Sequence, residues 1–499
     1  MLVIVSDLHL TDGTAGPSVS PQAFELFASQ LRSLAENASW RADGRYRPVE
    51  RIDVLLLGDT LDFMRSTTWT QRSDVRPWDV AHRPALIEIV GRITADILQH
   101  NERSLEILRS LAEDGAITIP PADLRGRPVV DTPATPVPLY IHYLVGEHDW
   151  FLHVDAKAYD DVRGLVVRHL GLAQRADEPF AHDASENEAL LELLRRHRLM
   201  ARHGDVFDPL SYNGQRDASS LSDAIAIELL TPFTSQIVLE LKEHLPAATA
   251  IGIGDLHHVR PLALVPAWIE SLLERTCPQA ELRRRIKVVW NRMVERLFEL
   301  PVAEQCQAWH GSELIARLRQ VMRIGAAGSG ISWNDESLEH MGQIASYARH
   351  AMGEPDFRNR RAKAIVYGHT HQSETMPLDA SFADGYVLNQ MYFNAGTWRR
   401  VMRPTAISPS LREFIAWESM GCAAFFQGDE RSGRPYETWN GTLGAKPIAA
   451  ATLRVDDTSS AEAPVPQHAP AGSHLGTSHV VPPHFATAPS RVIPVRRPT

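Results

Sequence analysis

Short apolar runs, each followed at once by polar residues, recur along this chain of 499 residues. Four of them lie at residues 2–5, 54–57, 140–145 and 365–367. Short runs rich in Val, Ile and Leu are typical of strands buried inside a sheet. Because ligand sites of open α/β sheets lie just beyond the strand ends, the polar residues after these runs are the first candidates for function.

Helical spacing of apolar residues appears in the two long segments between these runs. At 84–111 apolar residues recur three and four positions apart and Gly115 follows, which predicts one helix that packs on the sheet. The proline-rich stretch 116–138 predicts a loop. At 282–300 a second apolar stripe predicts an amphipathic helix.

Five polar clusters stand in a fixed order along the chain. They are Asp7 with His9, then Asp59, then Glu147 with His148 and Asp149, then His203, and last His369 with His371. Carboxylates and imidazoles are ligands that first-row divalent ions prefer. A carboxylate such as Asp59 can bridge two ions about 3.5–4 Å apart, and the water that both ions share ionises near neutral pH. The clusters together predict a two-metal phosphoesterase site, which needs no serine or cysteine nucleophile.

The order and spelling of the clusters resemble the calcineurin-like metallophosphoesterase family, whose blocks are D-x-H, G-D, G-N-H-D/E, H and G-H-x-H. Here they are SDLHL, LLLGDTLDF, LVGEHDW, ARHGD and VYGHTH, and FNAGTW at 393–398 resembles the closing strand and turn of the family. The resemblance covers residues 1–62, 140–208 and 362–430. It implies an α/β fold, a four-layer αββα sandwich with largely helical insertions. Strands expected around 386–394, 413–419 and 422–427 would complete its second sheet.

The resemblance also implies a role for each motif residue. One metal would be bound by Asp7, His9, Asp59 and His371. The second metal would be bound by Asp59, Glu147, His203 and His369. His148 would protonate the leaving oxygen as general acid, and Asp149 would orient its imidazole. We expect two divalent ions, with manganese as the first choice and iron, zinc or magnesium as alternatives.

The chain departs from the family pattern at Glu147, where the family usually has asparagine. A carboxylate adds negative charge to the site, so we expect the ions to be held more tightly and to be less electrophilic. The alternative is that Glu147 lies beside the metal without coordinating it.

Other histidines near the clusters are weaker candidates. The segment 254–258, GDLHH, imitates the first block, but no further block follows it, so we expect a loop there. His142 and His153 flank the third block. A lone histidine is more often a structural residue than a ligand, so both stay outside the predicted site.

Length and composition predict one catalytic domain over residues 1–447 with insertions at about 63–139 and 209–361. The tail 448–499 lacks periodicity and is expected to be disordered. The second insertion lies between His203 and His369, so it could cap the site. The basic residues of its helix indicate a solvated face, which we favour, or a basic lid that binds phosphate; they are Arg283, Arg284, Lys287 and Arg292. Arg399 and Arg400 leave open the same choice between surface charge and phosphate contact.

Charge and cysteine content limit the location and the partners. The net charge of -10 argues against indiscriminate binding of nucleic acid. The three cysteines Cys277, Cys306 and Cys422 lack C-x-x-C spacing, which fits a reducing compartment. No apolar run approaches the roughly 20 residues of a membrane span. We expect a cytoplasmic protein without a cleaved leader, since cleavage would remove Asp7 and His9.

The function that these patterns predict is metal-dependent hydrolysis of a phosphodiester, pyrophosphate or phosphomonoester, with a metal-bridging hydroxide as nucleophile. The spellings SDLHL and HGD point modestly to the bacterial pyrophosphatase and nuclease branches of the family. One alternative is a nuclease with a basic helical cap. The other is a non-catalytic scaffold for partner binding, which predicts lost ligands, whereas every predicted metal position here retains a side chain that can bind metal.

Overall fold

The computed structural model describes residues 1–79, 84–241, 244–325, 346–378, 390–408 and 411–442. The chain divides into two units, Met1–Ala445 and Lys446–Thr499, and every described residue belongs to the first. The predicted tail 448–499 lies outside the described residues.

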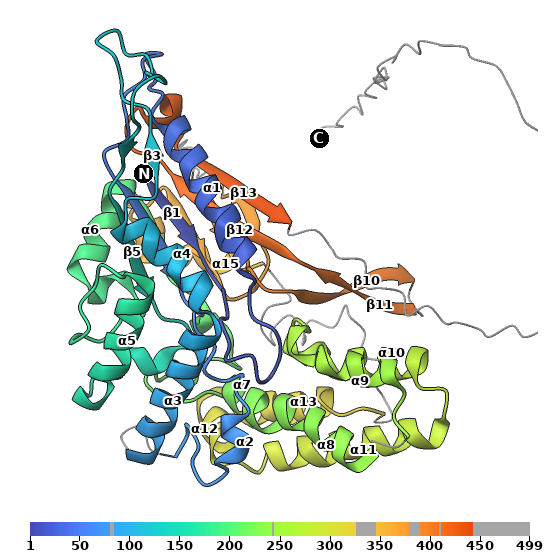
Figure 1. Ribbon diagram of the computed structural model, residues 1–499. Helices are drawn as coiled ribbons and strands as arrows, with labels where there is room; N and C mark the ends of the chain where they lie inside the picture. The colour runs from blue at the N-terminus through green and yellow to red at the C-terminus, as the bar shows by residue number, and fades with distance from the viewer. Residues whose placement is uncertain (80–83, 242–243, 326–345, 379–389, 409–410, 443–499) are drawn as a thin grey trace, which may run out of the picture. The chain divides into compact units, whose positions relative to one another are not determined.

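The largest sheet carries three of the predicted strands as parallel neighbours (Figure 1). Its strand order is β13-β12-β1-β2-β5. The bounds are β1 Leu2–Val5, β2 Ile52–Leu57, β5 Leu139–Leu144, β12 Ser419–Phe425 and β13 Tyr436–Thr442. Strands β1, β2 and β5 run parallel, so their carboxyl ends reach the same edge, while β12 is antiparallel to both β1 and β13.

A second sheet has the strand order β6-β7-β9-β8. The bounds are β6 Leu199–Ala201, β7 Ala364–Tyr367, β8 Glu374–Pro377 and β9 Met391–Asn394. Strands β6, β7 and β9 are parallel and β8 is antiparallel. Two further antiparallel pairs stand apart from both large sheets: β3 Thr118–Ile119 with β4 Thr135–Pro136, and β10 Val401–Ser408 with β11 Leu411–Trp417.

The expectation that three C-terminal strands complete the second sheet is wrong for two of them. Only β9 belongs to that sheet, and residues 386–389 of the predicted strand lie outside the described residues. Strand β11 pairs with β10, and β12 lies in the first sheet beside β1. The apolar pattern of a segment predicts that it forms a strand, but the pattern does not say which open sheet edge the strand will join.

Strands β1 and β2 of the first sheet are buried on both faces, which explains why they are apolar over most of their length. Val3 and Val5 pack on one face against helices, while Leu2 and Ile4 pack on the other face against the second sheet. The helices on the first face are α1 Pro21–Ala38, α3 Pro84–His100, α4 Glu102–Glu113 and α5 Asp160–Leu170.

The second sheet is also covered on both faces. Between the two sheets the rings of Phe393 and Phe425 lie 5.2 Å apart, and α6 Glu188–His197 packs into the same cluster. The other face of the second sheet packs on the short helices α15 Ala348–Ala351 and α16 Pro355–Arg358. The fold is therefore of the mixed α/β class, with helices and two large sheets in contact through apolar faces.

The first insertion differs from the single helix predicted at 84–111. Helices α3 and α4 are separated at Asn101, whose side-chain Nδ2 donates to the carbonyl oxygens of Ile97 at 2.7 Å and Thr11 at 2.8 Å. Asparagine competes for backbone hydrogen bonds in this way, and so it breaks a helix that apolar spacing alone would continue. A further short helix, α2 Thr68–Gln71, precedes the insertion helices.

The second insertion is helical, as predicted, and has an apolar core of its own. Its helices are α7 Leu221–Ala224, the π-helical turn η5 Ile225–Leu230, α8 Thr231–Leu241, α9 Ala247–Gly254, α10 Val265–Thr276, α11 Ala280–Leu297, α12 Pro301–His310 and α13 Ser312–Val321. Figure 1 shows these helices together, in green to yellow, near the β10-β11 pair. Met402 of β10 and Phe414 of β11 pack into that core.

The predicted amphipathic helix corresponds to α11, and its basic residues favour the solvated face. Arg284 pairs with Glu281 at 2.7 Å and Lys287 with Glu270 at 2.8 Å. The side chain of Arg284 is 70 % exposed, so its charge is largely solvated. These residues do not form a lid of unpaired positive charge.

One described helical segment, Leu221–Leu241, is long and apolar enough to cross a membrane by length and composition alone. It is not a continuous apolar run, since Asp223, Glu228 and Glu240 interrupt it, so the expectation drawn from apolar runs did not include it. More than half of its most apolar window, 56 %, is buried inside the fold. Leu229 and Phe233 lie in the core of the insertion, so packing accounts for its apolar character.

Candidate metal centre

The predicted ligands lie in turns that directly follow parallel strands. Asp7 and His9 follow β1, Asp59 follows β2, Glu147 follows β5, His203 follows β6, and His369 and His371 follow β7. Because β1, β2 and β5 are parallel in one sheet and β6 and β7 in the other, these turns meet at one edge of the two packed sheets. The topology thereby brings together residues up to 364 positions apart in the sequence.

Backbone strain is concentrated in these turns. Among the described residues, nine non-glycine residues have a positive φ, and five of them are predicted ligands. Their φ values lie between 47° and 64°; they are Asp7, His9, Asp59, His369 and His371. Such conformations cost about 1–3 kcal/mol each and persist where the surrounding structure enforces them, often at functional sites. The strain therefore supports a functional reading of the cluster.

Two motif glycines are needed because other side chains approach them closely. A Cβ at Gly146 would lie 2.4 Å from Oδ1 of Asp59. A Cβ at Gly368 would lie 2.0 Å from Oγ of Ser6 and 2.6 Å from Oδ2 of Asp7. The glycines of LVGEHDW and VYGHTH thus leave space for the carboxylates of the neighbouring turns.

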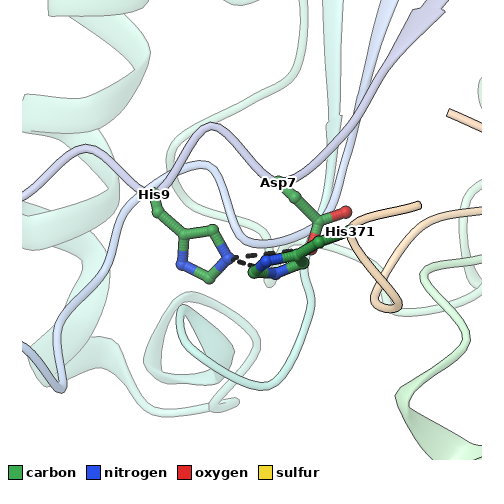
Figure 2. A group of neighbouring side chains, drawn as sticks. All are labelled: Asp7, His9 and His371. Atoms are coloured by element: carbon green, nitrogen blue, oxygen red, sulfur yellow. Dashed lines mark hydrogen bonds and ion pairs between the residues drawn. The ribbon is translucent and has the colours of Figure 1, made fainter. Parts of the chain in front are cut away.

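The first group of ligand atoms comes from the turns after β1 and β7. Figure 2 shows Asp7, His9 and His371 with their polar atoms directed toward one another. Nε2 of His371 lies 3.0 Å from Nε2 of His9 and 3.1 Å from Oδ1 of Asp7. All three side chains are buried, and they could hold one metal ion.

The second group consists of Glu147, His203 and His369. Oε2 of Glu147 lies 2.8 Å from Nε2 of His203, and its Oε1 lies 2.8 Å from Nδ1 of His369. Burial alone would raise the pKa of Glu147, but His369 and His203 lower it well below its usual range. Glu147 is therefore ionised and placed where a carboxylate ligand would be needed.

Asp59 lies between the two groups. Its Oδ2 is 3.6 Å from Nε2 of His9 and 3.4 Å from Nε2 of His203. This oxygen and Oδ1 of Asp7 are buried and accept no hydrogen bond from a described residue. Buried oxygens without a hydrogen-bond donor are costly, and coordinated cations would compensate them. The donor set therefore fits two divalent ions with Asp59 as the shared ligand.

The second ring nitrogen of three histidines is fixed by a partner outside the cluster. Nδ1 of His9 bonds with Oδ2 of Asp62 at 3.0 Å, and Nε2 of His369 with Oδ2 of Asp208 at 2.9 Å. Nδ1 of His203 bonds with the carbonyl oxygen of Leu57 at 2.9 Å. Such partners fix the tautomer and direct the other nitrogen toward a metal.

Sequence reasoning missed the two carboxylates Asp62 and Asp208. Each lies three positions after an aspartate in a quoted block, Asp62 after Asp59 and Asp208 after Asp205. The available signal was a second aspartate three positions after the first. This spacing did not identify which histidine the carboxylate would contact.

The expected partner of the general acid is corrected by the structure. Nδ1 of His148 bonds with Oδ1 of Asp62 at 2.9 Å, so Asp62 rather than Asp149 orients the imidazole. The carboxylate of Asp149 instead accepts the backbone N–H of Thr60 at 2.8 Å and of Gly146 at 2.6 Å. Asp149 thus links the turn after β2 to the turn after β5. It does not reach the imidazole of His148, because the side chains of these adjacent residues point in different directions.

The environment of His148 favours its protonated form. Burial alone would lower its pKa, but the carboxylates of Asp62 and Asp59 outweigh burial and raise the pKa to about 10. Nε2 lies 4.0 Å from Oδ2 of Asp59, at the boundary of the ligand cluster. A protonated imidazole is thus favoured beside the candidate metal ligands.

The two histidines left outside the predicted site have other partners. Nε2 of His142 bonds with Oδ1 of Asp53 at 2.9 Å, and Nδ1 of His153 with the carbonyl oxygen of Phe180 at 2.8 Å. His153 also forms, with His182 and Asp217, a partly exposed group that could hold a metal. Neither His142 nor His153 belongs to the seven-residue cluster.

The segment 254–258 is not the loop that we expected. Residues Leu256–His258 form a short 3-10 helix, and His257 is buried. His257 lines the same small cavity as His148 and His371. The segment lacks the family blocks, yet the folding of the second insertion carries it to the site.

Comparison of this chain with models of known protein families and with curated proteins finds no match. The interpretation of the site therefore depends on the residues themselves and on their geometry.

Proposed function

We propose that this protein is a two-metal phosphoesterase of the calcineurin-like type. The observation that carries the proposal is the position of Asp59 between two groups of buried ligands, with its Oδ2 facing a histidine of each. The packing of helices, two sheets and further helices supports the proposal, because the family that the motifs resemble has a four-layer sandwich.

Each ion would have four ligands, and Asp59 would belong to both sets. Asp7, His9, Asp59 and His371 would hold one ion. Asp59, Glu147, His203 and His369 would hold the other. A pair of divalent ions supplies an ionised water and neutralises the charge of an in-line phosphoryl displacement.

The chain's own residues supply the remaining steps. His148 donates a proton to the leaving oxygen, and Asp62 keeps its imidazole oriented and charged. The second insertion contributes His257 to the cavity beside His148, so it forms part of the wall on the leaving-group side.

Metal removal tests the proposal. We expect the chelated protein to hydrolyse none of p-nitrophenyl phosphate, bis(p-nitrophenyl) phosphate and a dinucleoside diphosphate, and Mn²⁺ to restore hydrolysis of at least one. The ions are expected because the buried carboxylates need cations. A folded protein that binds Mn²⁺ but hydrolyses no ester in the panel would favour the non-catalytic scaffold.

A further inference from the structure

Three arginines, Arg65, Arg260 and Arg399, are buried beside the ligand cluster, although arginine is almost never fully buried unless it is paired. Their exposed fractions are 2 %, 6 % and 6 %. They come from the turn after β2, from the second insertion and from the segment after β9. The fold therefore gathers three positive charges from distant parts of the chain.

Each guanidinium has a buried nitrogen that the described residues do not satisfy. Nε of all three arginines, and Nη1 of Arg399, make no hydrogen bond with a described residue. Nη1 of Arg260 donates to the backbone carbonyl of His257 at 3.1 Å. A carboxylate near Arg399 is that of Asp62, 3.9 Å from Nη1, and Asp62 already binds two histidines. The arginines thus retain donors for another anion.

The arrangement is electrostatically costly without such an anion. Burial lowers the pKa of Arg399 well below its usual range, the charges of Arg65 and Arg260 lower it further, and the carboxylates of Asp62 and Asp7 offset only part of this decrease. A buried charge without full compensation is unfavourable, and an anion bound by all three groups would offset that cost. The guanidinium geometry matches phosphate oxygens, to which arginine donates two parallel hydrogen bonds.

The position of the arginines relative to His148 identifies which part of the substrate they would meet. Arg65 and Arg260 line the small cavity that Glu147, His148 and His371 also line. His148 is the proposed donor to the leaving oxygen, so an anion at the arginines lies on the leaving-group side. Arg399 does not line this cavity, but it donates to the same His257 carbonyl oxygen as Arg260 and so lies beside it. Because Arg65, Arg260 and His148 share one small cavity, the two phosphorus centres would be close neighbours.

We propose that Arg65, Arg260 and Arg399 bind a phosphate carried by the leaving group, so that the preferred substrate contains a diphosphate linkage. This inference rests on the proposed phosphoesterase function. The water oxygen forms a bond to the first phosphorus and loses a proton to solvent. The bond from that phosphorus to the bridging oxygen breaks, and the bridging oxygen keeps the electron pair. The departing phosphate takes its proton from His148 and is held by the arginines.

Methylenediphosphonate, which has no P–O–P bond to cleave, tests the inference without activity. In calorimetric titrations of the Mn²⁺-loaded protein we expect it to bind about 10- to 100-fold more tightly than inorganic phosphate, the range that charge-assisted hydrogen bonds provide. Arg260→Gln and Arg65→Gln should lose most of this preference and keep their affinity for phosphate. Arg260→Lys should retain part of it.

Arg284→Gln on the exposed face of α11 is the matched control and should behave as wild type. Thermal melting and metal content identify a variant that has failed to fold. Equal affinity of the wild type for methylenediphosphonate and phosphate would overturn the inference. An equal loss of affinity for the two anions in Arg260→Gln would also overturn it. If the wild type prefers methylenediphosphonate but hydrolyses no ester, the inference about binding stands and the proposed function fails. If it hydrolyses bis(p-nitrophenyl) phosphate but neither binds nor cleaves diphosphates, the inference alone falls.

Discussion

Asp59→Asn is expected to remove bound metal and to lower kcat by at least about 10²- to 10³-fold, the range found when a preorganised electrostatic partner of the transition state is lost. The reason is that Oδ2 of Asp59 lies 3.6 Å from Nε2 of His9 and 3.4 Å from Nε2 of His203. Oδ1 of Asp7 also faces both histidines, but it lies farther from His203, at 4.0 Å. An amide provides a weaker ligand without the negative charge that two cations share. Metal analysis and turnover at saturating Mn²⁺ measure the two effects.

Asp53→Asn provides the matched control. Asp53 is a buried aspartate on β2, the strand that precedes Asp59, but its carboxylate bonds with His142 and Arg51 and belongs to no described group of candidate ligands. We expect the Asp53 variant to keep its metal and its turnover even if it is less stable. Normal turnover in Asp59→Asn would remove the two-metal account.

Asp62→Asn is expected to reduce both metal affinity and proton donation. Asp62 bonds with Nδ1 of His9 and with Nδ1 of His148, so one carboxylate orients a ligand and the general acid. Loss of such an outer partner typically costs about 10- to 100-fold in metal affinity or activity. Without the carboxylate the pKa of His148 should fall from about 10, and the proton donor should be lost as pH rises through a lower value.

Substrates with different leaving groups distinguish the effect of Asp62 on metal binding from its effect on proton donation. At saturating Mn²⁺, Asp62→Asn and His148→Ala should both slow an alkyl phosphate ester far more than a nitrophenyl ester, whose leaving oxygen needs little protonation. Asp149→Asn should show no such discrimination, because its carboxylate bonds with Thr60 and Gly146 rather than with His148. Equal losses of Asp62→Asn on both esters would assign Asp62 to metal positioning alone.

Most of the strands, and the polar clusters that follow them, were predictable because both appear as local patterns in the sequence. The runs 2–5, 54–57 and 365–367 lie within or coincide with strands β1, β2 and β7, and the polar residues after them lie at the shared edge of the sheets. Strand β6 was not predicted, since Leu199–Ala201 is too short to show a pattern. His203 was nonetheless recognised as a candidate from its place in the block order.

The remaining features depend on contacts between distant residues. The sequence could not show that Asp62 rather than the adjacent Asp149 reaches His148, since Asp62 stands in another block 86 positions away. The break at Asn101 depends on a hydrogen bond to Thr11, which a helical pattern does not encode. The role of Arg399 could not be decided from the sequence, because its burial comes from the packing of the second insertion. The His257 carbonyl oxygen of that insertion accepts a hydrogen bond from Arg399.

The central claim is that seven residues form one two-metal centre. Anomalous diffraction from crystals of the Mn²⁺-loaded protein tests it most directly. The account predicts two peaks about 3.5–4 Å apart on either side of Asp59, the separation of bridged metal pairs. The second peak should also lie within about 2.0–2.2 Å of a Glu147 oxygen, the usual length of a metal–carboxylate bond. A single peak, or two peaks that do not share Asp59, would contradict the account.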